Sequence, residues 1–181
     1  MRHPILFLAF LLSVLGGFSQ HDNEAQAGHE NPCFRGLKGL AGHWKGKYQW
    51  SNNPLAKGIM NAEYSLTGNG TAVVEDLSED GRKMMTSVYH MDGSGVRMTH
   101  FCAAGNQPRL LADSANSNTR SIEFRMLDIT NLSSPDAGHV YGLKVDFISG
   151  NRLNLTYKFI SKGVKSEELI ELTRQDSLTS N

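Results

Sequence analysis

The segment from Thr99 to Arg109, THFCAAGNQPR, gathers several chemically capable side chains, namely His100, Cys102, Asn106, Gln107 and Arg109. It begins in an alternating apolar strand and ends in a loop. Barrels and sandwiches usually place their chemistry at such a strand end, where a rigid scaffold carries a loop. These side chains can donate or accept hydrogen bonds, and a histidine or a cysteine can also bind a metal ion. The segment therefore marks a candidate site without identifying what it binds.

His100 has three interpretations. A buried imidazole needs a partner for each ring nitrogen, or a metal ion. His100 is therefore a structural histidine bonded to a tyrosine or a backbone carbonyl, a ligand contact, or a metal ligand. His139 follows Asp136, which either orients its ring or is an ordinary turn residue. A metal trio of His100, Cys102 and His139 matches no established zinc spacing, so we expect neither metal nor cofactor.

Arg109 ends the loop, directly after Pro108. An arginine at a cavity mouth suits a carboxylate or a phosphate. The alternative is an arginine that braces the loop through backbone carbonyls, with Asn106 and Gln107 as scaffolding. The sequence contains no serine nucleophile elbow, no P-loop and no dinucleotide glycine pattern. We therefore assign no catalytic residue and expect binding rather than catalysis.

The elements that position these residues are short strands divided by turn signals. The turns Asp92-Gly93-Ser94-Gly95 and Ser149-Gly150-Asn151 predict hairpins. About ten strands are expected, over residues 43–50, 59–66, 71–77, 84–91, 96–102, 109–112, 121–127, 140–148, 152–160 and 166–172. A short helix is expected near residues 34–40. Sequential strands without long crossovers predict an all-β, antiparallel up-and-down barrel.

The first hairpin also predicts which side chains face the barrel interior. Pairing Met91 with Val96 places Tyr89 opposite Met98 and Ser87 opposite His100. The inner face would then carry Ser87, Tyr89, Met91, Val96, Met98, His100 and Cys102. A barrel of ten strands leaves space for a small ligand. The candidate ligand-binding residues are Trp44, Tyr89, Met91, Met98, His100, Cys102, Asn106, Arg109 and His139.

The first residues resemble a targeting signal. A short basic start is followed by the apolar run from Ile5 to Phe18, a pattern typical of a secretory signal peptide. The run is shorter than the roughly 20 residues of a membrane span, although an uncleaved anchor is the alternative. We expect a signal peptide over residues 1–19, a disordered leader over 20–35, a barrel domain over 36–175 and a flexible tail over 176–181. The mature protein would then be periplasmic or secreted, with no stable membrane span.

The charge balance bears on the class of binding partner, and the two cysteines raise the question of a disulfide. Eighteen lysines and arginines balance eighteen aspartates and glutamates, and no basic stripe is present, which argues against nucleic acid as a partner. Cys33 and Cys102 either form a disulfide, as an oxidising compartment would allow, or remain free thiols. The sequence leaves the oligomeric state open.

Several motifs resemble a known family. Gly42-His43-Trp44, after a short helical stretch, resembles the G-x-W opening of lipocalin-like barrels, in which the tryptophan plugs one end. YHMDG, THFCAAGNQPR and TNLSSPDAGH together resemble a family of uncharacterised bacterial proteins with a lipocalin-like or nitrobindin-like barrel, from about Leu37 to Arg174. Nitrobindin-like barrels bind haem through a histidine near the end of the domain. The final strand here, SEELIELTR, contains no histidine, so that ligand does not carry over.

These observations predict an exported, lipocalin-like barrel that binds a small apolar or amphipathic ligand. The polar head of the ligand would lie near His100 and Arg109. One alternative is an enzyme in which His100 acts as general acid or base, oriented by Asp136 or paired with Cys102. The others are a His/Cys metal-binding barrel and a barrel filled by its own side chains.

Overall fold

The computed structural model describes residues 31–112 and 117–176. The expected signal peptide over residues 1–19 and most of the expected leader lie outside the described residues. Within them, the prediction of an all-β barrel with one short helix is confirmed. The helix is α1 (Pro32–Lys38), against the expected position near residues 34–40.

The ten predicted strands are all present, several of them longer than the sequence pattern indicated. They are β1 (Gly42–Trp50), β2 (Asn53–Thr67), β3 (Ala72–Glu79), β4 (Arg82–Asp92), β5 (Gly95–Phe101), β6 (Gln107–Ala112), β7 (Ser121–Thr130), β8 (His139–Ser149), β9 (Arg152–Ser161) and β10 (Val164–Arg174). A short 3₁₀ turn, η1 (Gly68–Gly70), connects β2 to β3.

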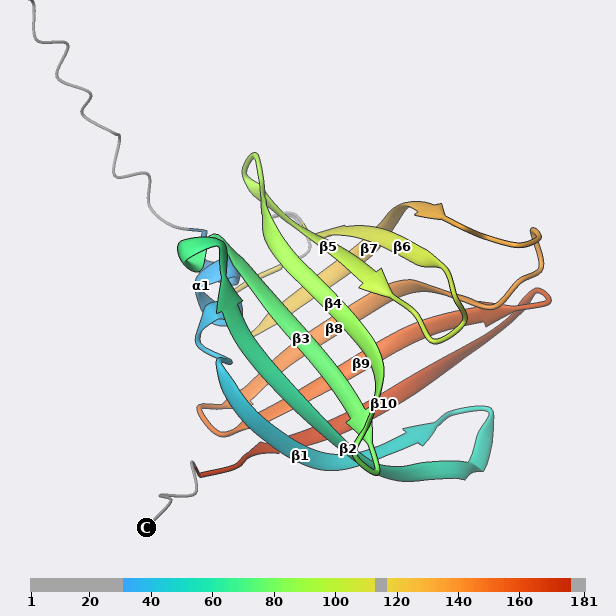
Figure 1. The fold of residues 1–181 in the computed structure, drawn as a ribbon, viewed down its shortest axis with the longest axis horizontal. Helices are drawn as coiled ribbons and strands as arrows, with labels where there is room; N and C mark the ends of the chain where they lie inside the picture. Colours follow the sequence, from blue (N-terminus) through green and yellow to red (C-terminus); the bar gives the residue numbers. More distant parts are fainter. Residues whose placement is uncertain (1–30, 113–116, 177–181) are drawn as a thin grey trace, which may run out of the picture.

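The strands form one closed antiparallel barrel in which each strand pairs with its neighbours in sequence and β1 pairs with β10 (Figure 1). Closure gives each strand a partner strand on both sides along at least part of its length. Helix α1 and η1 lie at one end of the barrel, called here the helix end. The β1–β2, β3–β4, β5–β6, β7–β8 and β9–β10 connections lie at the opposite end, called here the open end.

The helix end is sealed by apolar packing. The Asn31 side chain caps α1 by accepting hydrogen bonds from the backbone N–H groups of Cys33 and Phe34. Phe34 and Leu37 are buried below the helix. The Trp44 ring is also buried, and its indole N–H donates to the Leu40 carbonyl at 2.8 Å. Trp44 therefore belongs to the plug at the helix end, at a distance along the barrel from the open end.

The predicted β4–β5 register is confirmed. Met91 pairs with Val96, Tyr89 with Met98 and Ser87 with His100. Most of the expected inner face is fully buried, namely Ser87, Tyr89, Val96, Met98 and His100. On β7, Ile122 and Phe124 are buried, whereas Met126, two residues further on, is 39% exposed. The pairing of β7 with β8 ends at Arg125, so Met126 has no covering strand on that side.

Gly46 allows β1 and β10 to approach each other closely. A Cβ atom at this position would lie only 1.7 Å from the backbone oxygen of Glu171. Because a backbone atom cannot move aside without shifting the strand, any larger residue would force β1 and β10 apart.

We expect Gly46→Ala to destabilise the barrel by about 1–3 kcal/mol or more, the usual cost of overpacking. The matched control is Gly150→Ala in the β8–β9 turn, where an added Cβ meets no atom within 4 Å. Urea unfolding measured by circular dichroism provides both free energies of unfolding. Equal stability of the two variants would contradict the close β1–β10 approach.

Candidate functional site

A buried polar cluster crosses the middle of the barrel. Glu75 on β3 is 1% exposed, and its carboxyl group accepts hydrogen bonds from three tyrosines. Tyr64 donates at 2.6 Å and Tyr89 at 3.1 Å to Oε2, and Tyr157 donates at 2.5 Å to Oε1. The carboxyl group therefore has its acceptor capacity met inside the protein.

The cluster continues to Ser87 and His100. The Ser87 hydroxyl lies 3.0 Å from Nδ1 of His100 and 3.4 Å from the Tyr157 hydroxyl. The rings of His100 and Tyr157 pack against each other with centroids 5.2 Å apart. His100 is fully buried, and its Nε2 atom has no hydrogen-bond partner among the described residues.

Burial shapes the titration of this cluster. Desolvation raises the pKa of Glu75, although the hydroxyl donors, Tyr157 foremost, oppose that shift. Desolvation also lowers the pKa of His100 to about 4, so the imidazole is neutral at pH 7. The pKa values of Tyr64, Tyr89 and Tyr157 are all raised by burial and by the adjacent carboxyl group.

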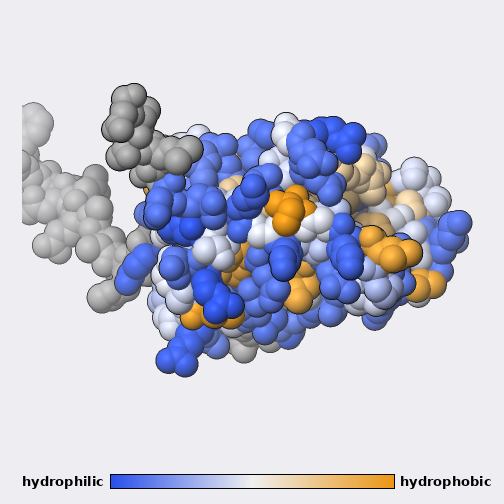
Figure 2. Space-filling model, turned by 90° about the horizontal axis from the view of Figure 1, so that it is seen from below, coloured by the Kyte–Doolittle hydropathy of each residue, from blue (hydrophilic) through white to orange (hydrophobic). Residues whose placement is uncertain are grey.

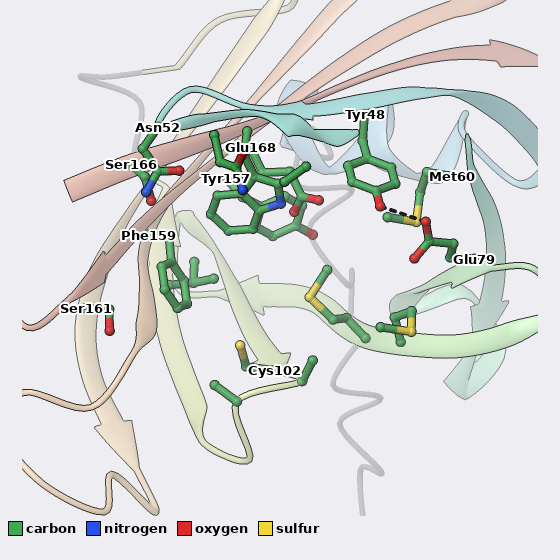
Figure 3. A pocket seen from close by; sticks show the side chains of 18 of the residues that line it. Tyr48, Asn52, Met60, Glu79, Cys102, Tyr157, Phe159, Ser161, Ser166 and Glu168 are labelled. Atoms are coloured by element: carbon green, nitrogen blue, oxygen red, sulfur yellow. Dashed lines mark hydrogen bonds between the residues drawn. The ribbon is translucent and has the colours of Figure 1, made fainter. Parts of the chain in front are cut away.

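A cavity of about 540 Å³ lies between this cluster and the open end (Figure 3). Its floor includes Tyr157 and Met60. Its lining is mostly apolar and comprises Tyr48, Trp50, Asn52, Asn53, Ala56, Met60, Glu79, Met84, Met85, Cys102, Ala103, Ala104, Val140, Tyr157, Phe159, Ser161, Val164, Ser166 and Glu168. The exposed residues Asn52, Ala104 and Val164 are in this set, so the cavity reaches the surface.

Glu168 on β10 is the more deeply placed of the two carboxyl groups in the cavity. The strand register puts it between Trp50 on β1 and Tyr157 on β9, with all three on the inner face. It is 5% exposed. Burial first, and then the charge of Glu79, raise the pKa of Glu168 to about 7, while a hydrogen bond from Trp50 opposes the shift.

Glu79 is the second carboxyl group. The Tyr48 hydroxyl donates to its Oε1 atom at 2.6 Å, as Figure 3 shows. The bond raises the pKa of Tyr48 to about 12. Gly58 provides the space for this pair, because a Cβ there would lie 2.8 Å from Glu79 Oε1 and from the Tyr48 ring.

Some of the candidate ligand-binding residues predicted from the sequence lie at the cavity, and others lie in the core around it. Cys102 lines the cavity. His100 and Tyr89 belong to the polar cluster beneath the floor, and Met98 is a buried core residue. Met91 packs against the core near the β4–β5 turn at the helix end.

Three other candidates are not among the residues that line the cavity. Arg109 is half-buried on the outer face and pairs with Asp128 across β6 and β7, because its neighbours Pro108 and Leu110 take the inner face. His139 precedes the inward Val140, so its side chain faces the outer side of the sheet. Its Nδ1 atom lies 2.9 Å from the carbonyl oxygen of Ala137. Asn106 is buried but braces a loop, donating to the Gly138 carbonyl at 2.8 Å. The predicted polar-head site at Arg109 is therefore not part of this cavity.

The next features are the two cysteines and the side chains that could bind a metal ion. Cys33 and Cys102 are both free thiols, the first at the helix end and the second at the cavity. Burial raises the pKa of both thiols. Within residues 31–112 and 117–176, no group of three or more His, Cys, Asp or Glu side chains is arranged to hold a metal ion. The same residues include no helix long and apolar enough to cross a membrane.

Sequence reasoning missed Glu75, Glu79, Glu168 and Tyr157. The signal that could have found them is strand parity, because alternate residues share a face. Glu75 alternates with the inward Val73 and Leu77, and Glu168 alternates with the inward Ile170 and Leu172. An acidic residue in phase with buried apolar ones is a buried charge that needs an explanation.

Comparison with known proteins supports the fold alone. No family model matches the chain, and no curated protein matches its sequence. A DUF3598 family protein of unknown function from Nostoc punctiforme PCC 73102 superposes with a TM-score of 0.53 at 15% identity. The match covers 77% of this chain and 48% of that protein, so the chain spans about half of its length. A redesigned β-barrel matches with a TM-score of 0.42 at 11% identity, covering 78% of this chain and 96% of the design.

We expect acid to destabilise the protein through His100. The unfolded histidine has a pKa of 6.5 and the buried one about 4, so the unfolded state binds the proton more readily between these values. The contribution of His100 to the free energy of unfolding is fully present above pH 6.5. It falls by about 3 kcal/mol as the pH is lowered to 4.

Urea unfolding of the native chain and of His100→Gln at pH 7 and pH 4 measures this effect. The variant should lose about 3 kcal/mol less than the native chain, since all other titrating groups are common to both. His90→Gln is the control, because His90 follows the inward Tyr89 and contacts the Met91 carbonyl outside the interior. A variant as acid-sensitive as the native chain would contradict this role of His100.

Proposed function

We propose that this chain is a binding barrel for a small, largely apolar molecule, held in the open-end cavity. The observation that carries the proposal is the cavity itself, about 540 Å³ of space with a mostly apolar lining. Ligand sites in proteins are commonly apolar clefts of about 300–1,000 Å³ with a few polar groups that fix orientation.

The distribution of apolar surface supports this proposal. The outer face seen in Figure 2 is largely hydrophilic, with hydrophobic residues scattered over it. The cavity instead gathers Trp50, Phe159 and three methionines, Met60, Met84 and Met85. Removing apolar ligand surface from water in such a space contributes about 25 cal/mol per Å². The helix end is closed by α1 and Trp44, so the open end is the route of entry.

The geometry favours binding over catalysis by His100. The imidazole is fully buried and is not part of the cavity lining. A general acid or base must come within hydrogen-bond reach of the substrate proton, directly or through one water molecule. In the cavity, the groups available to a ligand's polar head include Tyr48, Glu79 and Glu168 instead.

We expect bulky side chains in the cavity to abolish binding of an apolar probe. The neutral dye N-phenyl-1-naphthylamine should bind the native chain with a rise in fluorescence. Ala56→Phe and Ser161→Phe, which both fill lined space, should each weaken binding at least tenfold. Ser149→Phe is the control, because Ser149 is exposed at the helix end of β8. Unchanged dye affinity in both cavity variants would refute this location.

We also propose that the chain is exported. The basic start and the apolar run from Ile5 to Phe18 support a cleaved signal peptide. Expression of the full chain in a Gram-negative host should yield a periplasmic product whose N-terminus lies near Gln20. The paired variant Leu11→Arg interrupts the apolar run and should remain full-length in the cytoplasm. Recovery of an uncleaved native chain would contradict this proposal.

A further inference from the structure

We propose that the cavity is selective for organic cations, with an ammonium group seated beside Glu168 and an apolar body in the rest of the space. The inference rests on the proposed binding function and adds the chemical class of the ligand. It follows from the sign of the charges in the cavity, from the aromatic rings around Glu168 and from the burial of that residue.

The first argument is charge. The described residues that line the cavity include two carboxyl groups, Glu79 and Glu168, and no lysine, arginine or histidine. An anionic ligand would place a third negative charge beside these two in a space of low dielectric constant. A cationic ligand would instead supply the counter-charge that the lining lacks.

The second argument is the ring of aromatic groups. Glu168 is directly opposite Trp50 on one side and Tyr157 on the other. The rings of Trp50 and Phe159 meet edge to face, with centroids 5.5 Å apart and an interplanar angle of 87°. Aromatic faces attract cations, and sites of this composition recognise quaternary ammonium groups. A carboxylate and several rings together therefore suit an alkylated ammonium better than a hydrated inorganic ion.

The third argument is burial without full compensation. Glu168 is 5% exposed. Among the causes of its pKa, Trp50 is the one side chain that lowers the pKa by hydrogen bonding to the carboxyl group. Glu75, which is 1% exposed, has three tyrosine donors. A buried carboxylate is costly unless it is paired. A bound cation beside Glu168 would provide that pairing.

Glu79 extends the site toward the β3–β4 turn. Its position is fixed by the hydrogen bond from Tyr48 and by the space at Gly58. Its charge acts on Glu168 through space, because it is the second cause of the raised pKa of that residue. Both carboxyl groups line the same cavity, so Glu79 adds negative charge to the space in which the cation would lie.

The test compares three decyl probes that share an apolar chain, each used at monomeric concentration. They are decyltrimethylammonium, decanol and decanoate, and their affinities are measured at pH 8 by displacement of N-phenyl-1-naphthylamine. The native chain should bind the trimethylammonium probe at least tenfold more tightly than decanol, and decanoate most weakly. Glu168→Gln should remove the cation preference while the affinity for decanol stays unchanged.

Glu167→Gln is the matched control, because Glu167 is the next residue in β10, faces outward and does not line the cavity. It should retain the cation preference. The preference of the native chain for the cationic probe over decanol should also decline by up to tenfold per pH unit below about pH 7, as Glu168 becomes protonated.

Other titratable groups also face this space, namely Glu79, Tyr48, Tyr157 and Cys102. The same pH series on Glu79→Gln identifies any part of the decline that is due to Glu79.

The outcomes separate this inference from the proposed function. Decanol bound as tightly as the cation, or a cation preference that survives Glu168→Gln, would overturn the inference and leave the binding function standing. Displacement of the dye by none of the probes would overturn both.

Discussion

The hydrogen bond between Tyr157 and Glu75 is the interaction on which the interior of this barrel depends. Glu75 lies on β3 and Tyr157 on β9, and four steps around the closed sheet separate these strands. The bond therefore crosses the barrel, whereas the bonds from Tyr64 and Tyr89 come from the strands next to β3. A carboxyl group inside a protein must find its partners there, so the three tyrosines are held in place by the need to satisfy it.

This crossing bond divides the interior into two unlike spaces. Toward the helix end, buried leucines, valines and the Trp44 ring pack into one apolar core beneath α1. Toward the open end, Tyr157 forms part of a floor above which the side chains no longer meet. The polar cluster around Glu75 therefore lies between the apolar core and the cavity, and Tyr157 belongs to both the cluster and the cavity lining.

The sequence predicted the scaffold better than the site. Alternation and the Asp92–Gly95 turn were sufficient to place Ser87 opposite His100, because a hairpin fixes register and parity fixes the face. Arg109 was assigned to the cavity mouth from its loop position, although the inward Pro108 and Leu110 on either side require it to face outward. Glu75 and Glu168 were missed because acidic residues in a strand usually indicate a solvent face. The bond from Tyr157 to Glu75 joins residues 82 apart in sequence, so no local pattern could reveal it.

The two buried glutamates, Glu75 and Glu168, differ in whether the protein itself supplies partners for the carboxyl group. Glu75 is surrounded by donors supplied by the protein, and nothing further is needed to satisfy it. Glu168 is nearly as buried but faces a cavity, beside a second carboxyl group and with no lysine or arginine in the described lining. A residue that served stability alone would be better replaced at that position by an apolar one. Natural proteins keep such locally unfavourable groups where they act on a partner, and this is the physical ground for placing the ligand's charge at Glu168.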